Sequence, residues 1–174
     1  MPQTWVTSDL HFGHDRLFIW GPRGCESLEE MENTMIANWN NYVAPDDMVY
    51  VLGDIVFGDD IDATLKKVAQ LNGKKYLAIG NHDTDSKIVK YKEFKIFEDI
   101  QFAYRVKMGK SIMYLTHYPT IVANPGDKTR VYNVHGHTHS ALPIGEYANC
   151  YNVSPEAHAC APVLLGSIPG VLCS

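Results

Sequence analysis

The sequence has no long apolar run and no closely spaced cysteines. No stretch approaches the roughly 20 consecutive apolar residues that span a bilayer, so we predict no membrane contact. The N-terminus lacks a basic segment that leads into an apolar core, so we predict no signal peptide and a cytoplasmic location. The four cysteines form no Cys-x-x-Cys pair, which argues against a cysteine-bound zinc ion.

Positive charge is scarce in the first part of the chain. Residues 1–65 carry two arginines against twelve acidic residues, whereas residues 66–110 carry eleven lysines and arginines against five acids. The net charge of −5 argues against tight binding of long nucleic acid, which depends on many contacts with phosphates. The basic segment 66–110 either steers a small anion toward the protein or is a solvated helix face.

Strands and helices are predicted to alternate in the first half of the chain, whereas strands dominate the second half. The segments of strand type are 5–7, 48–52, 76–79, 102–106, 111–115, 131–134 and 151–153. The segments of helix type are 28–43, 60–71 and 86–91. This order predicts an α/β or α+β sandwich with at least one mixed sheet, and the 174 residues suit a single domain, 1–174.

Five of the strand-like segments end directly in residues that bind metals or transfer protons. These residues are Asp9-Leu10-His11, Gly53-Asp54, Gly80-Asn81-His82-Asp83, His117 and Gly136-His137-Thr138-His139. Because sites in α/β sheets form beyond the carboxyl ends of the strands, we expect the five clusters to meet in one crevice. On an extended backbone, Asp9 and His11 would point to the same side, as would His137 and His139. Carboxylate, amide and imidazole groups suit cations such as Mn²⁺, Fe, Zn²⁺ or Ni²⁺.

Taken singly, each of these motifs has a simpler explanation. A lone Asp-x-His is often a surface pair, a lone Gly-Asp is often a turn, and a lone histidine is often a hydrogen-bonded core residue. The ordered series, with each piece directly after a strand, argues for one metal site. Dinuclear hydrolases of the metallo-β-lactamase type need His-x-His-x-Asp-His, which residues 135–140 lack.

The ordered series resembles the motifs of the calcineurin-like metallophosphoesterases, and it extends from residue 9 to residue 139. The opening and closing segments also resemble small bacterial and phage members of this superfamily. They read Ser8-Asp9-Leu10-His11-Phe12-Gly13-His14 and Asn152-Val153-Ser154. The resemblance implies a four-layer αββα sandwich with two mixed β-sheets and a metal site at the carboxyl ends of the strands.

The resemblance also implies two divalent metal ions, with manganese expected first and Fe, Zn, Ni or Mg as alternatives. One ion would be bound by Asp9, His11 and His139, and the other by Asn81, His117 and His137, with Asp54 between them. His82 would be a general acid that faces the substrate and is held by Asp83. A hydroxide between the metals would be the nucleophile, in agreement with general two-metal chemistry.

One departure from the family pattern is Phe57, because many members carry Asp, Arg or His three residues after the bridging aspartate. His14 is therefore a candidate for a second catalytic group. Lys128 and Arg130 are candidates for binding a substrate phosphate. The segments 21–25 and 119–130 are expected to form loops that roof the site.

These features predict a metal-dependent phosphoesterase that acts on small phosphodiesters of nucleotide type. Its partner would be a small phosphorylated substrate, without an obligate protein partner. Two alternatives use the same site, namely a phosphomonoesterase and a nuclease. A third alternative is a noncatalytic scaffold that binds metal, although such scaffolds typically lose ligands that this sequence keeps.

Overall fold

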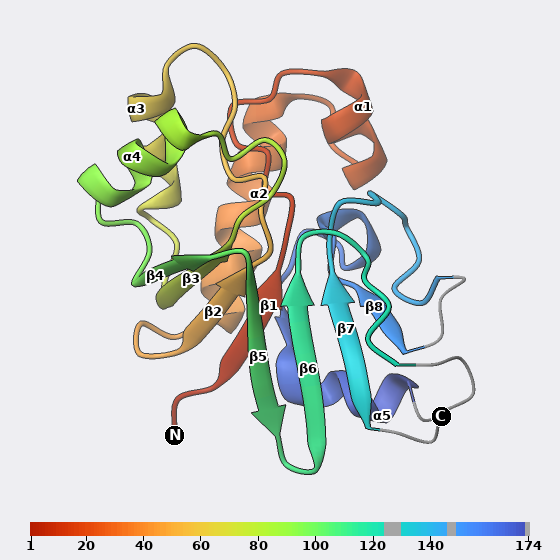
Figure 1. Ribbon diagram of the computed structural model, residues 1–174. Helices are drawn as coiled ribbons and strands as arrows, with labels where there is room; N and C mark the ends of the chain where they lie inside the picture. Colours follow the sequence, from red (N-terminus) through yellow and green to blue (C-terminus); the bar gives the residue numbers. More distant parts are fainter. Residues whose placement is uncertain (124–129, 146–148, 173–174) are drawn as a thin grey trace.

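Two β-sheets face each other in the computed structural model, which describes residues 1–123, 130–145 and 149–172 (Figure 1). The first sheet has the order β4-β3-β2-β1-β9, and the second has the order β5-β6-β7-β8. The strands are β1 (Thr4–Thr7), β2 (Met48–Val51), β3 (Lys74–Ala78), β4 (Asp99–Gln101), β5 (Ala103–Met108), β6 (Ser111–Thr116), β7 (Val131–His135), β8 (Cys150–Asn152) and β9 (Val163–Leu164).

Each sheet contains one antiparallel pair among parallel ones. In the first sheet β9 runs antiparallel to β1, and in the second β5 runs antiparallel to β6. The other neighbours are parallel. The prediction of a sandwich with two mixed sheets is therefore confirmed.

Three of the helices, α2, α3 and α4, lie on the outer face of the first sheet (Figure 1). The α-helices are α1 (Leu17–Trp20), α2 (Leu28–Tyr42), α3 (Ile61–Val68), α4 (Asp85–Glu93) and α5 (Ile168–Leu172). The 3-10 helices are η1 (Gly21–Arg23), η2 (Pro155–Ala157) and η3 (Leu165–Ser167). Ser27 caps α2, because its hydroxyl accepts a hydrogen bond from the Glu30 amide at 3.1 Å. None of the helices that the structure describes is long and apolar enough to cross a bilayer.

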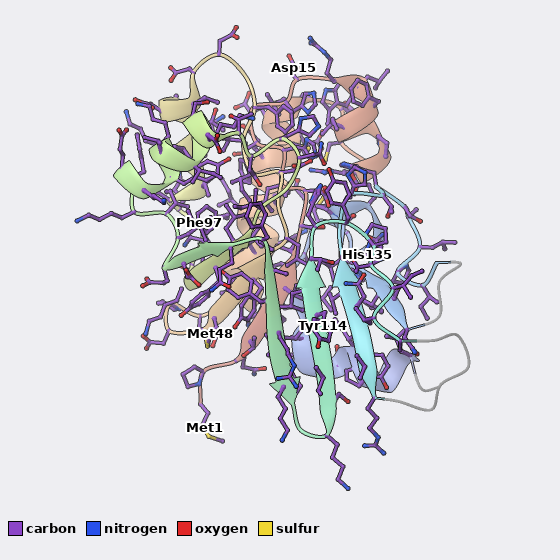
Figure 2. The ribbon with its side chains drawn as sticks, in the orientation of Figure 1. Met1, Asp15, Met48, Phe97, Tyr114 and His135 are labelled. Carbon is purple, nitrogen blue, oxygen red and sulfur yellow. The ribbon has the colours of Figure 1, made fainter. Side chains whose placement is uncertain are left out.

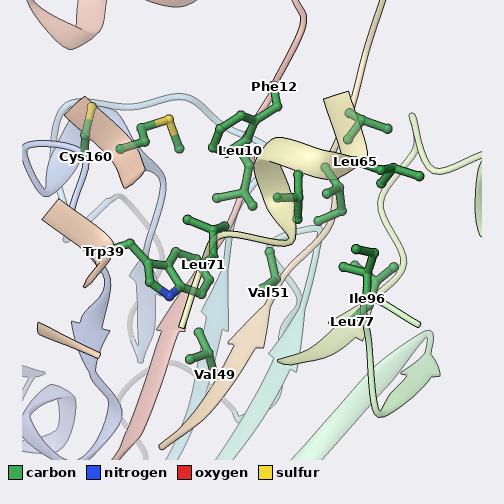
Figure 3. Packing of buried hydrophobic residues seen from close by; sticks show 14 of the residues in the cluster. Leu10, Phe12, Trp39, Val49, Val51, Leu65, Leu71, Leu77, Ile96 and Cys160 are labelled. Atoms are coloured by element: carbon green, nitrogen blue, oxygen red, sulfur yellow. The ribbon is translucent and has the colours of Figure 1, made fainter. Parts of the chain in front are cut away.

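The alternation of side chains along β2 explains why the protein has two hydrophobic cores. Val49 and Val51 pack with the helices, and Figure 3 shows them near Trp39, Leu71 and Leu77. Tyr50 and Leu52 point the other way, into a second core between the two sheets. The first sheet is therefore buried on both faces, which explains the continuous apolar run in the sequence.

The outer face of the second sheet is more open. Arg105 and Lys107 of β5 are exposed there, and Figure 2 labels Tyr114 and His135 on β6 and β7. Among the described residues no helix covers this face (Figure 1). The described part of the chain therefore forms three layers, α, β and β, of the expected αββα sandwich.

Candidate metal centre

The five predicted clusters meet at one end of the sandwich, beyond the carboxyl ends of β1, β2, β3, β6 and β7 (Figure 1). The Asp54 carboxylate lies in the middle of them. Its Oδ2 atom is 3.8 Å from His11 Nε2, 3.7 Å from His117 Nε2 and 4.0 Å from His82 Nε2. Residues from three strand ends and both sheets therefore surround one carboxylate oxygen.

Two groups of side chains offer ligand atoms that lie within 4.8 Å of one another. The first group is Asp9, His11 and His139, and the second is Asp9, Asp54 and His117. Two further predicted ligands adjoin the second group. Asn81 Oδ1 lies 2.7 Å from His117 Nε2, and the His137 ring centroid lies 5.0 Å from that of His117. The fold thus brings all seven predicted ligands together.

The backbone at the centre is strained rather than extended. Asp9, His11, Asp54, His137 and His139 all have positive φ angles, between 48° and 66°. L-residues seldom adopt this region, so these turns are held by surrounding contacts. The expectation that an extended backbone aims each Asp-x-His or His-x-His pair is wrong, because β1 and β7 end before these residues begin.

Each aspartate uses one oxygen to bind the scaffold and turns the other toward the histidines. Asp9 Oδ2 accepts hydrogen bonds from the His137 amide at 2.9 Å and the Ser154 hydroxyl at 3.3 Å. Asp54 Oδ1 accepts one from the His82 amide at 2.9 Å. A glycine permits the first contact, because a Cβ atom on Gly136 would lie 2.3 Å from Asp9 Oδ2.

Three of the histidines are oriented through their Nδ1 atoms. His117 Nδ1 lies 2.8 Å from the Leu52 carbonyl oxygen, His139 Nδ1 lies 3.0 Å from Glu156 Oε1, and His11 Nδ1 lies 3.0 Å from His14 Nδ1. Carbonyl and carboxylate oxygens only accept, so His117 and His139 carry the proton on Nδ1. Their Nε2 atoms could then bind a cation, and Asn81 Oδ1, 2.7 Å from His117 Nε2, is placed to bind the same one.

The polar atoms at the centre fit bound metal ions. Asp9 Oδ1 and His11 Nε2 are buried without a hydrogen-bond partner among the described residues. Such an orphaned group costs about 1–3 kcal/mol, which a cation would offset. Burial, together with the charges of His139 and Arg23, lowers the pKa of His11 far below its usual value, so its imidazole is neutral. Burial raises the pKa of Asp54, and a cation beside it would oppose this effect.

His82 differs from the proposed ligands because it reaches solvent. Its side chain is 47% exposed, whereas those of His11 and His117 are 3% and 1% exposed. Its Nε2 atom nevertheless lies 4.0 Å from Asp54 Oδ2. This placement at the edge of the centre suits the predicted role toward a substrate.

Asp83 does not hold His82 in the way that the family resemblance implies. Its buried carboxylate accepts hydrogen bonds from the amides of Asp54, Ile55 and Gly80, at 2.9, 3.2 and 2.9 Å. It also accepts one from the Tyr91 hydroxyl at 2.9 Å. No hydrogen bond to the His82 imidazole is found in the described part of the chain. Asp83 is therefore a positioning residue that ties the ends of β2 and β3 to α4.

Phe57 forms an aromatic wall beside the centre. Its ring centroid lies 4.1 Å from that of His14 and 4.6 Å from that of His11, with nearly parallel planes, and 4.7 Å from that of His82. The Lys87 ammonium lies 4.3 Å from the same centroid. His14 thus contacts both Phe57 and the Nδ1 atom of a proposed ligand, a role that its sequence position did not indicate.

Two residues that sequence reasoning missed lie beneath the centre. Arg23 was expected in a loop that roofs the site, but its buried side chain pairs with Glu156 at 2.9 Å. Burial alone would raise the pKa of Glu156, but the hydrogen bond from His139 and the charge of Arg23 lower it to about 2. Neither residue stands in a recognisable motif, so the sequence held no signal for them.

Of the two candidate phosphate-binding cations, the structure describes only Arg130, which lies away from the centre. Arg130 is exposed and directly precedes β7, whereas the centre follows the other end of that strand. Five strand residues separate the two ends, which corresponds to roughly 15–20 Å. The prediction that Arg130 binds substrate is therefore wrong for this geometry. Lys128 lies outside the described residues.

A two-sheet sandwich with Asp and His side chains beyond its strand ends is typical of metal-dependent phosphoesterases. Residues 2–157 match the family described as calcineurin-like phosphoesterase. The chain belongs to this family.

The chain is also similar to several other proteins in sequence and, for the solved structures, in fold. The Gene 66 protein of Mycobacterium phage L5 is 31% identical over 176 residues, covering 84% of this chain and 82% of its own length. An uncharacterised protein of Methanocaldococcus jannaschii is 28% identical, covering 97% and 90%. The structure of a protein of unknown function from Aquifex aeolicus has a TM-score of 0.73 at 22% identity, covering 98% of this chain and 100% of that one. An archaeal phosphodiesterase has a TM-score of 0.50 at 19% identity, covering 88% and 82%.

Proposed function

We propose that this protein hydrolyses small phosphodiesters of nucleotide type with the help of two divalent metal ions, manganese first among them. The observation that carries the proposal is that the seven predicted ligand side chains, Asp54 among them, lie together beside a solvent-exposed His82. Oxygen and imidazole ligands in this mixture suit Mn²⁺ and the neighbouring first-row metals.

Each group of residues has a separate task in this proposal. Asp9, His11 and His139 would hold one ion, and Asn81, His117 and His137 the other, with Asp54 between them. Bound ions of this kind polarise phosphoryl oxygens and activate water. His82 would hold a proton at Nε2 and donate it to the leaving-group oxygen, because its imidazole is exposed and also faces Asp54.

The cationic side chains near the centre favour a diester over a monoester. Lys87 donates to the carbonyl oxygens of Val56 and His82 at 2.6 and 2.9 Å, and Arg23 is buried in its ion pair. Arg16 donates to the Asp15 carbonyl oxygen at 2.9 Å. Arg23 already pairs with a carboxylate, and Lys87 and Arg16 are turned toward main-chain carbonyl oxygens, so among the described residues no arginine cluster stands ready to neutralise the second charge of a phosphomonoester. A diester carries only one negative charge.

An exposed apolar patch beside the centre supports the nucleotide part of the proposal. Leu17 and Phe18 of α1 are each 67% exposed. The Phe18 ring lies edge-on to His14, with 5.7 Å between the centroids. An exposed aromatic ring in this position offers a stacking surface for a base. A structural neighbour that is a phosphodiesterase is in keeping with diester chemistry on this fold.

Rates on matched substrates test the proposal. Metal-reconstituted protein is assayed with bis-(p-nitrophenyl) phosphate and p-nitrophenyl phosphate, then with 2′,3′- and 3′,5′-cyclic nucleotides and plasmid DNA. We expect a preference for the diesters. A tenfold preference for the monoester, about 1.4 kcal/mol of transition-state stabilisation, would contradict it, and efficient plasmid degradation would favour a nuclease. Bound metal without turnover on any substrate would favour the noncatalytic scaffold.

A further inference from the structure

A buried ion pair joins two distant parts of the chain beneath the metal centre. Arg23 Nε and Glu156 Oε1 are 2.9 Å apart, although 133 residues separate them in the sequence. Their side chains are 0% and 2% exposed. Burying two charges carries a desolvation penalty that an apolar pair would avoid, so stability alone is a poor explanation for this pair.

Both members of the pair hold parts of the same ligand group. The Glu156 Oε1 atom that pairs with Arg23 also lies 3.0 Å from His139 Nδ1. The two terminal nitrogens of Arg23 donate to the carbonyl oxygens of Leu10 and Asp9, at 3.0 and 2.7 Å. The pair therefore acts on His139 through its carboxylate and on the Asp9 turn through its guanidinium.

The contact with His139 decides which ring nitrogen is free. A neutral imidazole in water prefers to carry its proton on Nε2, and this would block that atom as a ligand. Glu156 can only accept from His139, so it keeps the proton on Nδ1. The free Nε2 atom then lies 3.7 Å from Asp9 Oδ1, the buried carboxylate oxygen that has no hydrogen-bond partner among the described residues.

The contacts with the main chain hold a strained turn. Asp9 has a φ angle of +48°, which is unfavourable for a residue with a side chain. Arg23 fixes the carbonyl oxygens of this turn from below with two charge-assisted hydrogen bonds. A lysine could not reproduce this pair of hydrogen bonds, because only the guanidinium offers several donors in a fixed plane.

The second ligand group is oriented by different means. His117 Nδ1 faces the main-chain carbonyl oxygen of Leu52, which no side-chain substitution removes. The ion pair therefore supports a histidine of the first ligand group, whereas the histidine of the second group is held by the main chain.

We propose that the Arg23–Glu156 pair is a positioning device for the metal position formed by Asp9, His11 and His139. By fixing the His139 tautomer and the Asp9 turn, it makes this position bind a divalent cation more tightly than it otherwise would. This inference rests on the proposed metal centre but is independent of the substrate.

The first test reads the tautomer in metal-free protein. Nitrogen-15 NMR of the histidine side chains should show the proton of His139 on Nδ1 in the wild type. The Glu156→Ala variant should shift it to Nε2, whereas Glu156→Gln keeps an oxygen acceptor and should retain the wild-type tautomer. An unchanged tautomer in Glu156→Ala would overturn the inference.

The second test is a calorimetric titration of metal-free protein with Mn²⁺. Glu156→Ala should weaken one of two binding events by about 10–100-fold, the usual effect of losing such a support, and leave the other nearly unchanged. Glu156→Gln should show a smaller loss, and it provides a result if the alanine variant fails to fold. The inference would be contradicted if both binding events were weakened to the same extent, or if neither lost affinity for Mn²⁺.

A matched control is a buried carboxylate far from the centre. Asp47 is 5% exposed and accepts hydrogen bonds at the opposite ends of β1 and β2. Asp47→Asn should lower stability without changing either Mn²⁺ affinity. If the wild type binds no Mn²⁺, the proposed function fails, while the NMR measurement still decides whether Glu156 orients His139.

Discussion

His117 Nδ1 lies 2.8 Å from the carbonyl oxygen of Leu52, so a histidine from the second sheet is held by a residue from the first. His117 follows β6, and Leu52 follows β2. The contact directs His117 Nε2 toward Asn81 Oδ1 at 2.7 Å and Asp54 Oδ2 at 3.7 Å. The centre therefore depends on how the two sheets pack, and not only on the loops that carry its residues.

Asp54→Asn should weaken both metal positions at once. Its Oδ2 atom lies between His11 and His117, which belong to different ligand groups, and the amide carries no charge. Elemental analysis after mild reconstitution should give two equivalents of divalent metal in the wild type and fewer than one in the variant. A wild-type plateau at one equivalent, or none, would contradict the proposal of two metals.

His82→Asn should keep its metal and lose turnover. The imidazole is 47% exposed and belongs to neither ligand group, so metal content should match that of the wild type. Turnover should fall by about 10²–10⁴-fold, the usual range for a general acid. The loss should be smaller when the leaving group is p-nitrophenolate, which needs no proton. A variant that loses metal together with activity would show that His82 is a ligand.

The sequence predicted the residues of the centre because each follows a strand that its apolar pattern reveals. The predicted helix over 28–43 and the strand over 48–52 agree closely with α2 and β2, since a capping box and a continuous apolar run mark them. The short elements α1, β4 and β9 were not predicted. Their few residues carry too little periodicity, and only packing against the rest of the fold defines them.

For a related reason, the contacts that support the centre could not be predicted from the sequence. Asp83 stands next to His82 in sequence, yet it binds main-chain amides from two strand ends and the Tyr91 hydroxyl. Arg23 and Glu156 meet only after the chain has folded. Pairings between distant residues leave no local pattern, so a single sequence reveals which residues gather at the centre but not what holds them in place.

Tyr91→Phe should be mildly destabilising without a direct effect on chemistry. The buried hydroxyl donates to Asp83 at 2.9 Å, and its loss leaves that carboxylate with three amide donors. We expect the free energy of unfolding to fall by about 1 kcal/mol, the usual net value of a hydrogen bond. Urea unfolding measures this change, and an unaltered kcat would confirm that Asp83 acts on the scaffold. A large fall in kcat with unchanged stability would contradict that role.

Phe18→Ala should weaken the binding of substrates that carry a base. Thymidine 5′-(p-nitrophenyl) phosphate and methyl p-nitrophenyl phosphate share a leaving group but differ in the base. Stacking on one aromatic ring contributes about 1–3 kcal/mol, so KM for the thymidine ester should rise at least fivefold. KM for the methyl ester should hardly change. Phe102→Ala is the control, because Phe102 is 82% exposed between β4 and β5. Equal effects on both esters would contradict base stacking at Phe18.

Asp47→Asn should destabilise the fold in a way that depends on pH. The Asp47 carboxylate accepts hydrogen bonds from the Gln3 amide, the Trp5 indole and the Ala44 amide, at 2.7, 2.9 and 3.0 Å. The bond from Gln3 does most to hold the pKa of Asp47 below its ordinary value, against the opposing effect of burial. An asparagine offers only one acceptor oxygen, and its amino group would face one of these donors.

Because the pKa of Asp47 is lower in the folded protein than in the unfolded chain, its stabilisation is fully present above the unfolded value of about 3.9. It is lost as the pH falls through the folded value. Asp47→Asn should therefore lower the free energy of unfolding by about 1–2 kcal/mol at pH 7, and the gap to the wild type should narrow in acid. Urea unfolding at a series of pH values measures this gap.

Asp46→Asn is the matched control, because Asp46 is exposed and one residue away, and it should leave stability nearly unchanged. A gap that is constant from pH 7 into strong acid would show that Asp47 does not act through its charge.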